Sequence, residues 1–349
     1  MQVLHNQPLA PYTSLNVGGS GAIVAFPIFE SDVVELIKAS GYHFTILGYG
    51  CNALISDHGL PGTTIIWRRG GITINGTRLD VGAGVWWDDV VKTAIDHQLW
   101  GLELMSEIPS SVGGAVYGNI AAYGQQVSDT LESIRVFNQH SGNIEEINIE
   151  DTDKLAFSYR SSSLQFNEPY VVLGATFRLS PTPLHELKYD AALAVGEELN
   201  LDHRTLEHCR EIIIETRRRA GSIYHPDEPT DIHSAGSFFK NPMVSVEQAK
   251  ELAGFDESGK TLERIINQSV VHGGNAQRAS AAHVLLAAGF HRGQRWGHVE
   301  LHPSHVLKLA TLEGATAQEV YDVTQEIIRN VKDKLGIDLE PEVKFLGEF

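Results

Sequence analysis

Two glycine-rich segments have the composition of loops that hold a phosphorylated ligand. In GYGCNAL (48–54), Gly48 and Gly50 leave backbone N–H groups able to approach a phosphate. In IPSSVGGAVYGNIAAYG (108–124), the density of small side chains permits close contact with a flat or anionic ligand. The alternatives are a tight turn in the first segment and a small-residue helix packed on a sheet in the second. The 48–54 segment itself matches neither the dinucleotide-binding pattern G-x-G-x-x-G nor the P-loop pattern G-x-x-x-x-G-K-[ST].

Two further groups of residues could carry chemistry. SAGSFFKNP (234–242) holds Ser237 between glycine and bulky apolar residues, which restrains a polar group, although serine beside glycine is also typical of turns. Arg217, Arg218 and Arg219 form the densest positive charge in the chain. They either complement the dipole at the C-terminus of a helix or bind a diphosphate.

The surrounding segments predict a mixture of helices and strands that would position these residues. Apolar spacing predicts helices over 32–40 (capped by Ser31), 85–99, 205–219 (capped by Asp202) and 316–336. In the second of these, Trp86, Val90, Ala94 and Ile95 are expected on the buried face. Strand-like patterns cover 22–28, 63–68 and 170–179, and 337–347 ends as a strand. The 44–55 segment reads as a strand, a glycine loop and an apolar run, and 132–149 as two strands around the turn Ser141-Gly142-Asn143. Asn75-Gly76 predicts a hairpin within 72–84.

Composition excludes several classes of protein. The length of 349 residues suggests two or three domains, and a hydrophobic fraction of 42% is ordinary for a globular protein. The formal charge of −17 argues against nucleic acid or an anionic membrane as a partner. The chain has two distant cysteines, Cys51 and Cys209, and no Cys-x-x-Cys pair, so neither a zinc–thiolate site nor a disulfide framework is expected. With no signal peptide and no long apolar run, the expectation is a cytoplasmic protein without a metal.

Six segments, in this order, resemble the motifs of one family, the UDP-N-acetylenolpyruvoylglucosamine reductases (UDP-N-acetylmuramate dehydrogenases), flavoenzymes of bacterial cell-wall synthesis. The segments are YTSLNVGG (12–19), ILGYGCNALI (46–55), GLELMSEIPSSVGGAVYGNIAAYG (101–124), FSYRSS (157–162), SAGSFFKNP (234–242) and LEPEVKFLG (339–347). In addition, HELKYDAAL (185–193) resembles the tyrosine-bearing substrate loop of the longer subtype.

The resemblance implies an α+β fold. It comprises an FAD-binding module of the vanillyl-alcohol-oxidase-like (PCMH) type in two α/β subdomains, followed by a C-terminal α+β substrate-binding domain. The expected boundaries are 1–66 for the first FAD-binding subdomain, 67–216 for the second and 217–336 for the substrate-binding domain. The C-terminal strand, within 337–349, is expected to return to the first subdomain.

The family's reaction, as the resemblance implies it, reduces UDP-N-acetylglucosamine enolpyruvate to UDP-N-acetylmuramate, with FAD as cofactor and NADPH as reductant. A hydride passes from flavin N5 to the β-carbon of the enolpyruvyl group, and the α-carbon is then protonated. Arg160 would stabilise the negative charge that develops on the carboxylate. Ser237 would donate the proton, and Glu342 would be the acidic partner that stabilises the enolic intermediate. From the residues alone, each is equally a solvated arginine, a turn serine or a surface carboxylate.

The ligand-binding residues are likewise implied by the resemblance. For the sugar nucleotide they are Tyr189, Asn241 and His305, although a surface histidine is the alternative for His305. For FAD they are expected to act through backbone N–H groups and close approach to the ring. They are Gly48, Tyr49, Gly50, Cys51, Asn52, Gly113, Gly114, Asn119, Ala122, Tyr123 and Gly124.

Several positions depart from the family's pattern. Cys51 replaces a serine of the pyrophosphate loop, which weakens hydrogen bonding and raises the question of a covalent flavin. Ser110 and Ala121 replace glycines. A lysine expected in the segment GSIYHPDEP (221–229) is absent, so that another residue, such as one of Arg217–Arg219, would contact the phosphate. Residues 256–279 read as an expanded polar loop.

Two rival functions remain for this sequence. A related FAD-dependent oxidase would use O₂ and no NADPH, and it would have no reason to keep Arg160, Ser237 and Glu342 together with the Tyr189 loop. A catalytically inactive UDP-sugar-binding protein would not need the three catalytic candidates. No dimerisation signal is present, so a monomer is expected.

Overall fold

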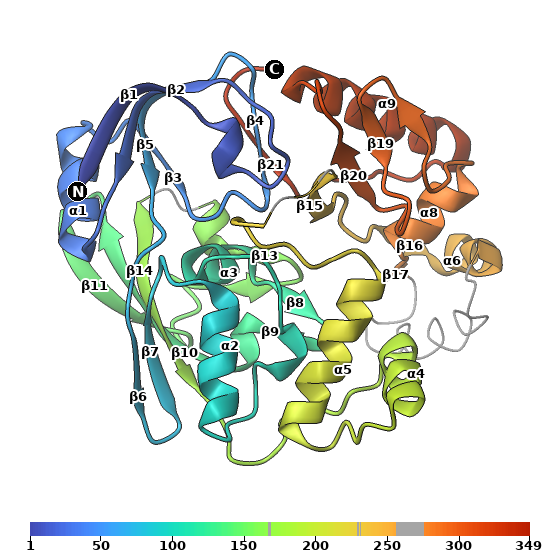
Figure 1. Cartoon of the computed structure of the whole chain (residues 1–349), viewed down its shortest axis with the longest axis horizontal. Coiled ribbons are helices and arrows are strands. Elements are labelled where there is room, and N and C mark those ends of the chain that lie inside the picture. The colour runs from blue at the N-terminus through green and yellow to red at the C-terminus, as the bar shows by residue number, and fades with distance from the viewer. Residues whose placement is uncertain (167–168, 229, 231, 256–275) are drawn as a thin grey trace. The chain divides into compact units, whose positions relative to one another are not determined.

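The computed structural model describes residues 1–166, 169–228, 230, 232–255 and 276–349 (Figure 1). The chain divides into two compact units, each built from separate stretches. Unit 1 comprises Met1–Gln7, Gly21–Gly50 and Leu60–Glu228, and unit 2 comprises Pro8–Ser20, Cys51–Gly59 and Pro229–Phe349. The chain thus passes from unit 1 to unit 2 between Gly50 and Cys51, inside the first glycine-rich segment. The three-part division expected from the sequence stays a prediction.

The first sheet of unit 1 has the strand order β1-β2-β5-β3, and β2 and β3 both run parallel to β5. Helix α1 connects β2 to β3 and places Val33 and Ile37 in one apolar cluster with Ile65 of β5. The strands are β1 Gln2–Pro8, β2 Ser20–Phe26, β3 Phe44–Leu47 and β5 Leu60–Ile66, and the helix is α1 Glu30–Ala39.

The second sheet of unit 1 is antiparallel, with the order β11-β10-β14-β7-β6. Helices α2 and α3 bury Trp87, Val90, Val112 and Val116 in one apolar cluster with residues of this sheet. The strands are β6 Ile72–Asn75, β7 Arg78–Gly82, β10 Leu131–Asn138, β11 Asn143–Asn148 and β14 Tyr170–Arg178, and the helices are α2 Trp87–Asp96 and α3 Val112–Gly118.

Two more helices and two small hairpins complete unit 1. The helices α4 and α5 pack together through Val195, Cys209, Ile212 and Ile213. Their bounds are α4 Asp190–Leu199 and α5 Leu206–Arg219, and those of the hairpin strands are β8 Ala121–Ala122, β9 Gln125–Gln126, β12 Phe157–Ser158 and β13 Ser161–Ser162. Short 3₁₀ turns of unit 1 are η2 Glu103–Met105, η3 Val127–Asp129 and η4 Ser163–Gln165.

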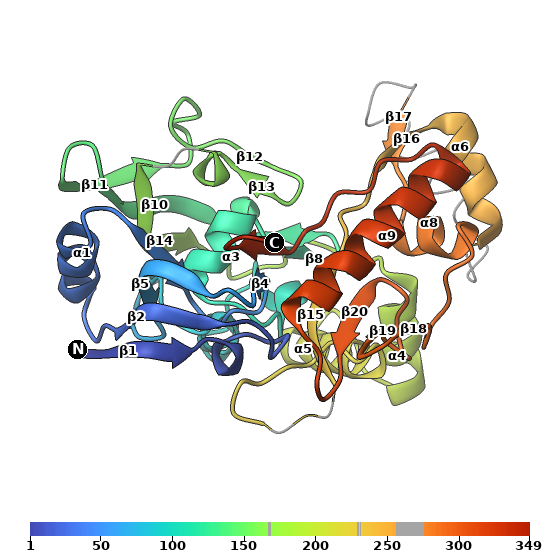
Figure 2. The same ribbon diagram turned by 90° about the horizontal axis from the view of Figure 1, so that it is seen from above.

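Unit 2 is built on a sheet with the order β15-β20-β19-β18, and α9 runs along it (Figure 2). Beside it, β21 pairs in parallel with β4, so the C-terminal strand lies next to residues of the N-terminal segment. The strands are β4 Ala53–Ile55, β15 His233–Ser237, β16 Met243–Ser245, β17 Ala276–Arg278, β18 Arg295–Trp296, β19 Val299–Leu301, β20 Lys308–Thr311 and β21 Lys344–Leu346. The helices are α6 Val246–Leu252, α8 Ala281–Ala287 and α9 Ala317–Leu335, with 3₁₀ turns η1 Ala10–Tyr12 and η5 Ala253–Phe255.

Several local expectations are wrong at the ends of elements. Helix α1 begins at Glu30, one residue before the proposed cap Ser31, and the carboxylate of Asp32 accepts hydrogen bonds from the amides of Ile28 and Phe29 instead. Helix α5 is preceded by Thr205 rather than capped by Asp202. The strand expected over 337–347 covers only Lys344–Leu346.

Two other expectations are off by one residue. The β6–β7 turn is centred on Gly76-Thr77 because Asn75 pairs with Arg78. In α2, Trp87 is buried, while Trp86 precedes the helix and is only partly buried.

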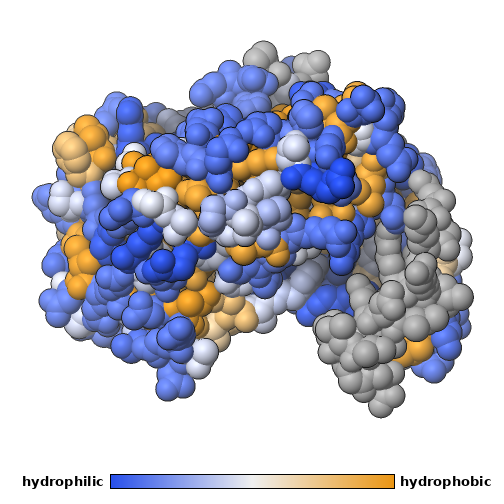
Figure 3. All heavy atoms as spheres, turned by 90° about the horizontal axis from the view of Figure 1, so that it is seen from below, coloured by the Kyte–Doolittle hydropathy of each residue, from blue (hydrophilic) through white to orange (hydrophobic). Residues whose placement is uncertain are grey.

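Polar side chains cover most of the face shown in Figure 3, with apolar residues scattered among them. The pattern agrees with a chain whose apolar residues lie mostly in its buried clusters. Within the described ranges, no helix has both the length and the apolar character needed to cross a bilayer.

Candidate active site

The first glycine-rich segment of unit 1 packs directly against the second. A Cβ atom built on Gly48 would lie 2.3 Å from Oγ and 2.8 Å from Cβ of Ser111, so no side chain fits there. Among the described residues, the amides of Gly48 and Gly50 have no hydrogen-bond acceptor. Two open amides on glycine residues suit a phosphate, which is the ligand expected from the sequence.

Tyr49, between these glycines, is fixed by an aromatic ring and a cation. Its ring lies edge-on to Trp86 with centroids 4.5 Å apart, and the guanidinium of Arg68 lies 4.9 Å from the Tyr49 ring centroid. Arg68 Nε also donates to the Gly48 carbonyl at 2.9 Å. Arg68 thus places a positive charge on the loop, and sequence reasoning missed it. The only signal available was its position as the last residue of the strand predicted over 63–68.

In the second segment, the amides at the start of α3 donate to acceptors within the chain. At the start of α3, the Val112 amide donates to Val85 and the Gly113 amide donates to Ala83, while Gly114 donates to the Ser111 hydroxyl. The N–H groups of Gly113 and Gly114, expected to face a ligand, are therefore used inside the chain. Gly113 also packs closely, since a Cβ there would lie 3.1 Å from Cβ of Ala83.

Asn119 supports another candidate residue rather than presenting its own amide. It ends α3 in the left-handed conformation (φ 43°) and is fully buried. Its Nδ2 donates to the Ser158 carbonyl at 2.9 Å, and its Oδ1 accepts from the Ser128 amide at 3.1 Å. Ser158 is the last residue of β12 and directly precedes the two-residue turn, Tyr159-Arg160, that leads into β13. Asn119 thus anchors the hairpin that positions Arg160, which itself is left-handed (φ 52°).

Ala122, Tyr123 and Gly124 form a second tight hairpin. Tyr123 (φ 52°) and Gly124 (φ 92°) are the two turn residues between β8 and β9, a turn with positive φ at both positions. This turn presents the Tyr123 ring edge-on to Tyr189, with centroids 5.1 Å apart. Unit 1 therefore brings together one residue proposed for FAD and one proposed for substrate.

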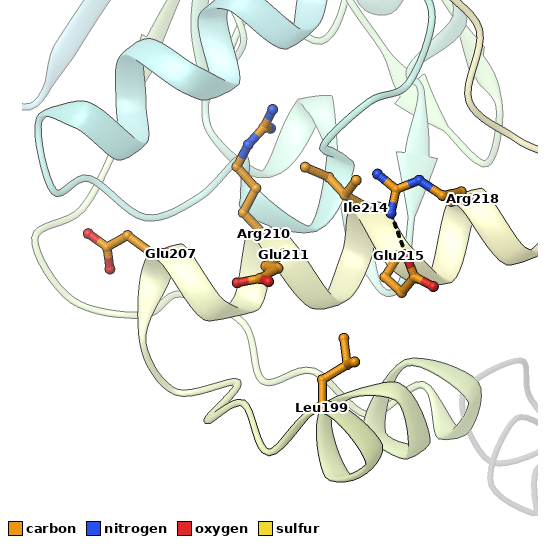
Figure 4. A pocket seen from close by; sticks show the side chains of 7 residues that line it. All are labelled: Leu199, Glu207, Arg210, Glu211, Ile214, Glu215 and Arg218. Atoms are coloured by element: carbon orange, nitrogen blue, oxygen red, sulfur yellow. Dashed lines mark hydrogen bonds and ion pairs between the residues drawn. The ribbon is translucent and has the colours of Figure 1, made fainter.

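The three arginines at the end of α5 have different surroundings. Arg218 and Arg219 are exposed and form ion pairs with Glu215, and Arg219 also pairs with Glu198 at 2.7 Å. Figure 4 shows Arg218 on the side of α5 that forms a shallow pocket with Leu199 of α4. These two arginines fit the helix-terminus alternative.

Arg217 instead points inward. Its Nη2 donates to the Ser222 carbonyl at 2.9 Å, and its guanidinium lies beside the Tyr123 hydroxyl. Burial raises the pKa of Tyr123, and Arg217 acts against that rise. Of the arginine run, Arg217 is thus the residue that faces the Tyr123–Tyr189 pair.

A buried ionic network lies next to these residues in unit 1. Asp88 is fully buried and accepts two hydrogen bonds from Arg210, both at 2.7 Å, and one from the Glu107 amide at 2.8 Å. Glu107 is left-handed (φ 58°), and its Oε2 lies 3.4 Å from Nε2 of His225. Burial is the largest cause that raises the pKa of Glu107, followed by the charge of Asp88. Figure 4 shows Arg210 pointing away from α4.

In unit 2, the structure brings Ser237, Glu342 and Asn52 into one hydrogen-bonded arrangement. The Glu342 amide donates to the carbonyl of Phe238, the residue after Ser237, at 2.8 Å. Asn52 Nδ2 donates to the Glu342 carbonyl at 3.2 Å, and the Asn52 carbonyl accepts from the Lys344 amide at 3.0 Å. Cys51 is buried, and its carbonyl accepts from the Ser14 hydroxyl at 3.4 Å. Two catalytic candidates are thus joined to the end of the flavin loop.

The two substrate candidates of unit 2 have defined polar atoms. Asn241 Oδ1 accepts from the Ala281 amide at 2.9 Å and so holds the start of α8. His305 Nδ1 accepts from the Leu307 amide at 3.1 Å, which leaves the ring proton on Nε2. Burial, followed by the charges of Lys308, Arg292 and His302, lowers the pKa of His305 to about 4. His305 is therefore a neutral hydrogen-bond donor near neutral pH. Most of the 256–279 segment (256–275) lies outside the described residues.

Two similarities to known proteins define the class of protein to which the chain belongs. Residues 23–148 match the profile described as "FAD binding domain". The fold is similar to that of 6-hydroxy-D-nicotine oxidase from Arthrobacter nicotinovorans, with a TM-score of 0.50 and 14% identity over 97% of this chain and 86% of that one. The expected α+β fold with an FAD-binding module of this type is confirmed, and the chain is an FAD-dependent oxidoreductase.

The chain belongs to the UDP-N-acetylenolpyruvoylglucosamine reductase family. Residues 228–346 match the profile described as "UDP-N-acetylenolpyruvoylglucosamine reductase, C-terminal domain". The reductase of Streptomyces coelicolor is 30% identical over 99% of this chain and 91% of that protein. That of Tropheryma whipplei is 32% identical over 96% and 97%. The crystal structure of the reductase from Thermus caldophilus has a TM-score of 0.64 and 25% identity, and the match covers 99% of this chain and 98% of that one.

Proposed function

We propose that this protein reduces the enolpyruvyl group of UDP-N-acetylglucosamine enolpyruvate to give UDP-N-acetylmuramate, with NADPH as the reductant. The observation that carries the proposal is the pairing of the segments that hold Ser237 and Glu342, through the Glu342 amide and the Phe238 carbonyl. Proton donation to an enol-like carbon needs an acidic group held in a fixed position, and this pairing supplies two adjacent candidates.

The residues of the first loop fit FAD. Gly48 has no room for a side chain, the Gly48 and Gly50 amides are open to an acceptor within the described residues, and Arg68 adds a positive charge. These features suit the pyrophosphate. FAD held there would supply the hydride for the β-carbon of the enolpyruvyl group, with NADPH as the source of that hydride. The other expected residues stay proposed FAD contacts, and in Gly113 and Gly114 the backbone amides already donate within the chain. They are Tyr49, Cys51, Asn52, Gly113, Gly114, Asn119, Ala122, Tyr123 and Gly124.

The protein's own residues then stabilise the developing negative charge and donate the proton. Arg160, at the tip of its hairpin, forks onto the substrate carboxylate and stabilises the negative charge that develops there. The Ser237 hydroxyl gives its proton to the α-carbon, and the Glu342 carboxyl stabilises the enolic state. Each role follows from the family to which the chain belongs.

Four residues are proposed to hold the sugar nucleotide. Tyr189 stacks or hydrogen-bonds, Asn241 offers its amide nitrogen and His305 donates from Nε2. Arg217 is the proposed phosphate contact in place of the missing lysine, because Arg218 and Arg219 are already paired at the surface. An FAD-dependent oxidase is the alternative function, and the titration that follows distinguishes it from the reductase.

The proposed function is tested by an anaerobic titration of the purified protein in two steps. NADPH is expected to bleach the flavin absorbance band, and the enolpyruvyl sugar nucleotide is expected to restore it. A protein without bound flavin would contradict the proposal. A reduced flavin that O₂ reoxidises rapidly, and that the sugar nucleotide does not, would establish the oxidase alternative instead.

The role of Ser237 is tested by Ser237→Ala in the same experiment. We expect flavin reduction by NADPH to keep its rate, while reoxidation by the sugar nucleotide slows by about 10²–10⁴-fold, the usual contribution of a positioned acid. Ser31→Ala is the matched control, because Ser31 is an exposed residue of α1 and has no proposed role in the reaction. If Ser237→Ala slows both half-reactions equally, the assigned role is wrong.

A further inference from the structure

One face of the unit 2 sheet carries a row of polar side chains across three strands. Ser237 of β15 is the ladder partner of Lys308 on β20, and the His302 amide at the end of β19 donates to the Lys308 carbonyl at 2.9 Å. Ladder partners project to the same side of a sheet, with Cβ atoms about 4.5–5.5 Å apart. The Lys308 side chain therefore starts beside that of Ser237.

The ladder is interrupted directly before Ser237. The register shifts between Ser234 and Ser237, where Gly236 adopts φ 78°. Bulges of this kind re-aim the next side chain and are frequent beside functional sites. Here the bulge sets Ser237, rather than Ala235 or Gly236, opposite Lys308.

Lys308 is buried, with 3% of its surface exposed, which is rare for a lysine. Its charge acts on His302 and His305, and Glu300 also acts on His302 while Arg292 also acts on His305. Glu300 is held by Arg295 at 2.7 Å. Lys308 is among the causes that lower the pKa values of both His302 and His305, after burial in each case. Its positive charge thus acts on the polar end of the sheet that also carries Ser237.

A serine hydroxyl is a weak acid, and giving up its proton leaves a full negative charge on oxygen. Fixed positive charge near such an oxygen is a large source of catalysis, because it stabilises the charge as it develops. We propose that Lys308 is a positioning residue for Ser237: its ammonium group stabilises the negative charge on Ser237 Oγ when the hydroxyl protonates the α-carbon of the substrate.

The step needs no further reagent. The Oγ–H bond of Ser237 breaks and a C–H bond forms at the α-carbon with the electron pair of the enolic substrate. The oxygen, held by the Lys308 charge, regains a proton from water after the product leaves. This inference rests on the proposed function.

The test compares Lys308→Met with Lys308→Arg in the two half-reactions. For Lys308→Met, we expect unchanged reduction by NADPH and a 10–10³-fold slower reoxidation by the sugar nucleotide, with a larger solvent deuterium isotope effect on that step. Lys308→Arg keeps the charge and is expected to restore most of the rate. Lys332→Met, at an exposed ion pair on α9, is the matched control with no expected effect.

A measurement without substrate tests the electrostatics separately. An NMR titration of His305 in Lys308→Met is expected to give a higher pKa than in the wild type, because one cation has been removed. Equal slowing of both half-reactions, an unchanged reoxidation rate or an unchanged isotope effect would overturn the inference. A wild-type protein whose flavin is not reoxidised by the sugar nucleotide would instead overturn the proposed function.

Discussion

At the scale of single residues, the contact between Gly48 and Ser111 is the tightest link between the two loops proposed for FAD. We expect Gly48→Ala to lower the free energy of unfolding by about 1–3 kcal/mol, the usual cost of overpacking, and to lose FAD on gel filtration. The measurements are urea denaturation and the ratio of flavin to protein absorbance.

The control for Gly48→Ala is Gly71→Ala, because a Cβ on Gly71 meets no atom within 4 Å. Adding Ser111→Gly to Gly48→Ala removes the clashing atoms and is expected to recover part of the stability. Full FAD content in Gly48→Ala would show that the loop does not need this contact.

For the candidate site, the sequence predicted which residues matter better than it predicted which atoms they contact. The resemblance located Arg160, Ser237 and Glu342 on short motifs, and the structure gives each motif a turn or a strand pairing. The resemblance did not reveal that the amides of Gly113 and Gly114 donate hydrogen bonds within the chain. Their acceptors, Ala83 and Ser111, are brought to them by tertiary packing. Nothing near Lys308 in the sequence predicts its role, because its ladder partner Ser237 is 71 positions away on another strand.

At the scale of elements, the ion pair between Asp88 of α2 and Arg210 of α5 joins two helices far apart in the chain. Hydrogen bonds and charge from Arg210, with further contributions from the Glu107 amide and Lys92, outweigh burial and lower the pKa of Asp88 to about 2. A carboxyl group with a depressed pKa stabilises the fold above its unfolded pKa of 3.8 and loses that contribution as pH falls toward 2.

We therefore expect Asp88 to contribute about 2 kcal/mol at neutral pH, all of it lost between about pH 4 and pH 2. Urea denaturation of the wild type and of Asp88→Asn across this range is the measurement. The variant is expected to be less stable at pH 7 and to show a smaller decline in acid. Asp89→Asn, an exposed neighbour, is the control. Identical acid declines in the wild type and Asp88→Asn would contradict the assignment.

Elements with strong periodicity were predicted well, and those fixed by tertiary contacts were not. The helix α9, expected over 316–336, spans Ala317–Leu335, and a hairpin was expected where β6 and β7 lie. Helix α4 was not predicted, because its segment was read as a loop around Tyr189. The local errors at Ser31 and Asp202 arise because nearby polar residues compete for the same helix start, and side-chain geometry decides between them.

At the scale of the whole molecule, a formal charge of −17 opposes the approach of anionic NADPH and sugar nucleotide. Salt shortens the Debye length from about 30 Å at 0.01 M to about 8 Å at 0.15 M, which screens the distant charges more than a contact. We expect the association rate constant of NADPH, measured by stopped-flow flavin bleaching, to rise a few-fold over this range. A steady fall would show that nearby cations such as Arg68 and Arg217 dominate the approach.

The way in which unit 2 is assembled has a consequence for synthesis. Strand β4 lies near the start of the chain, yet its partner β21 is separated from it by about 290 residues, a pairing of very high contact order. During translation the N-terminal part of a chain emerges first. The stretches Pro8–Ser20 and Cys51–Gly59 must therefore wait for the C-terminal part before unit 2 can close. A ribosome stalled before Lys344 would hold a chain whose β4 has no strand to pair with, so completion of this unit is an event that follows translation.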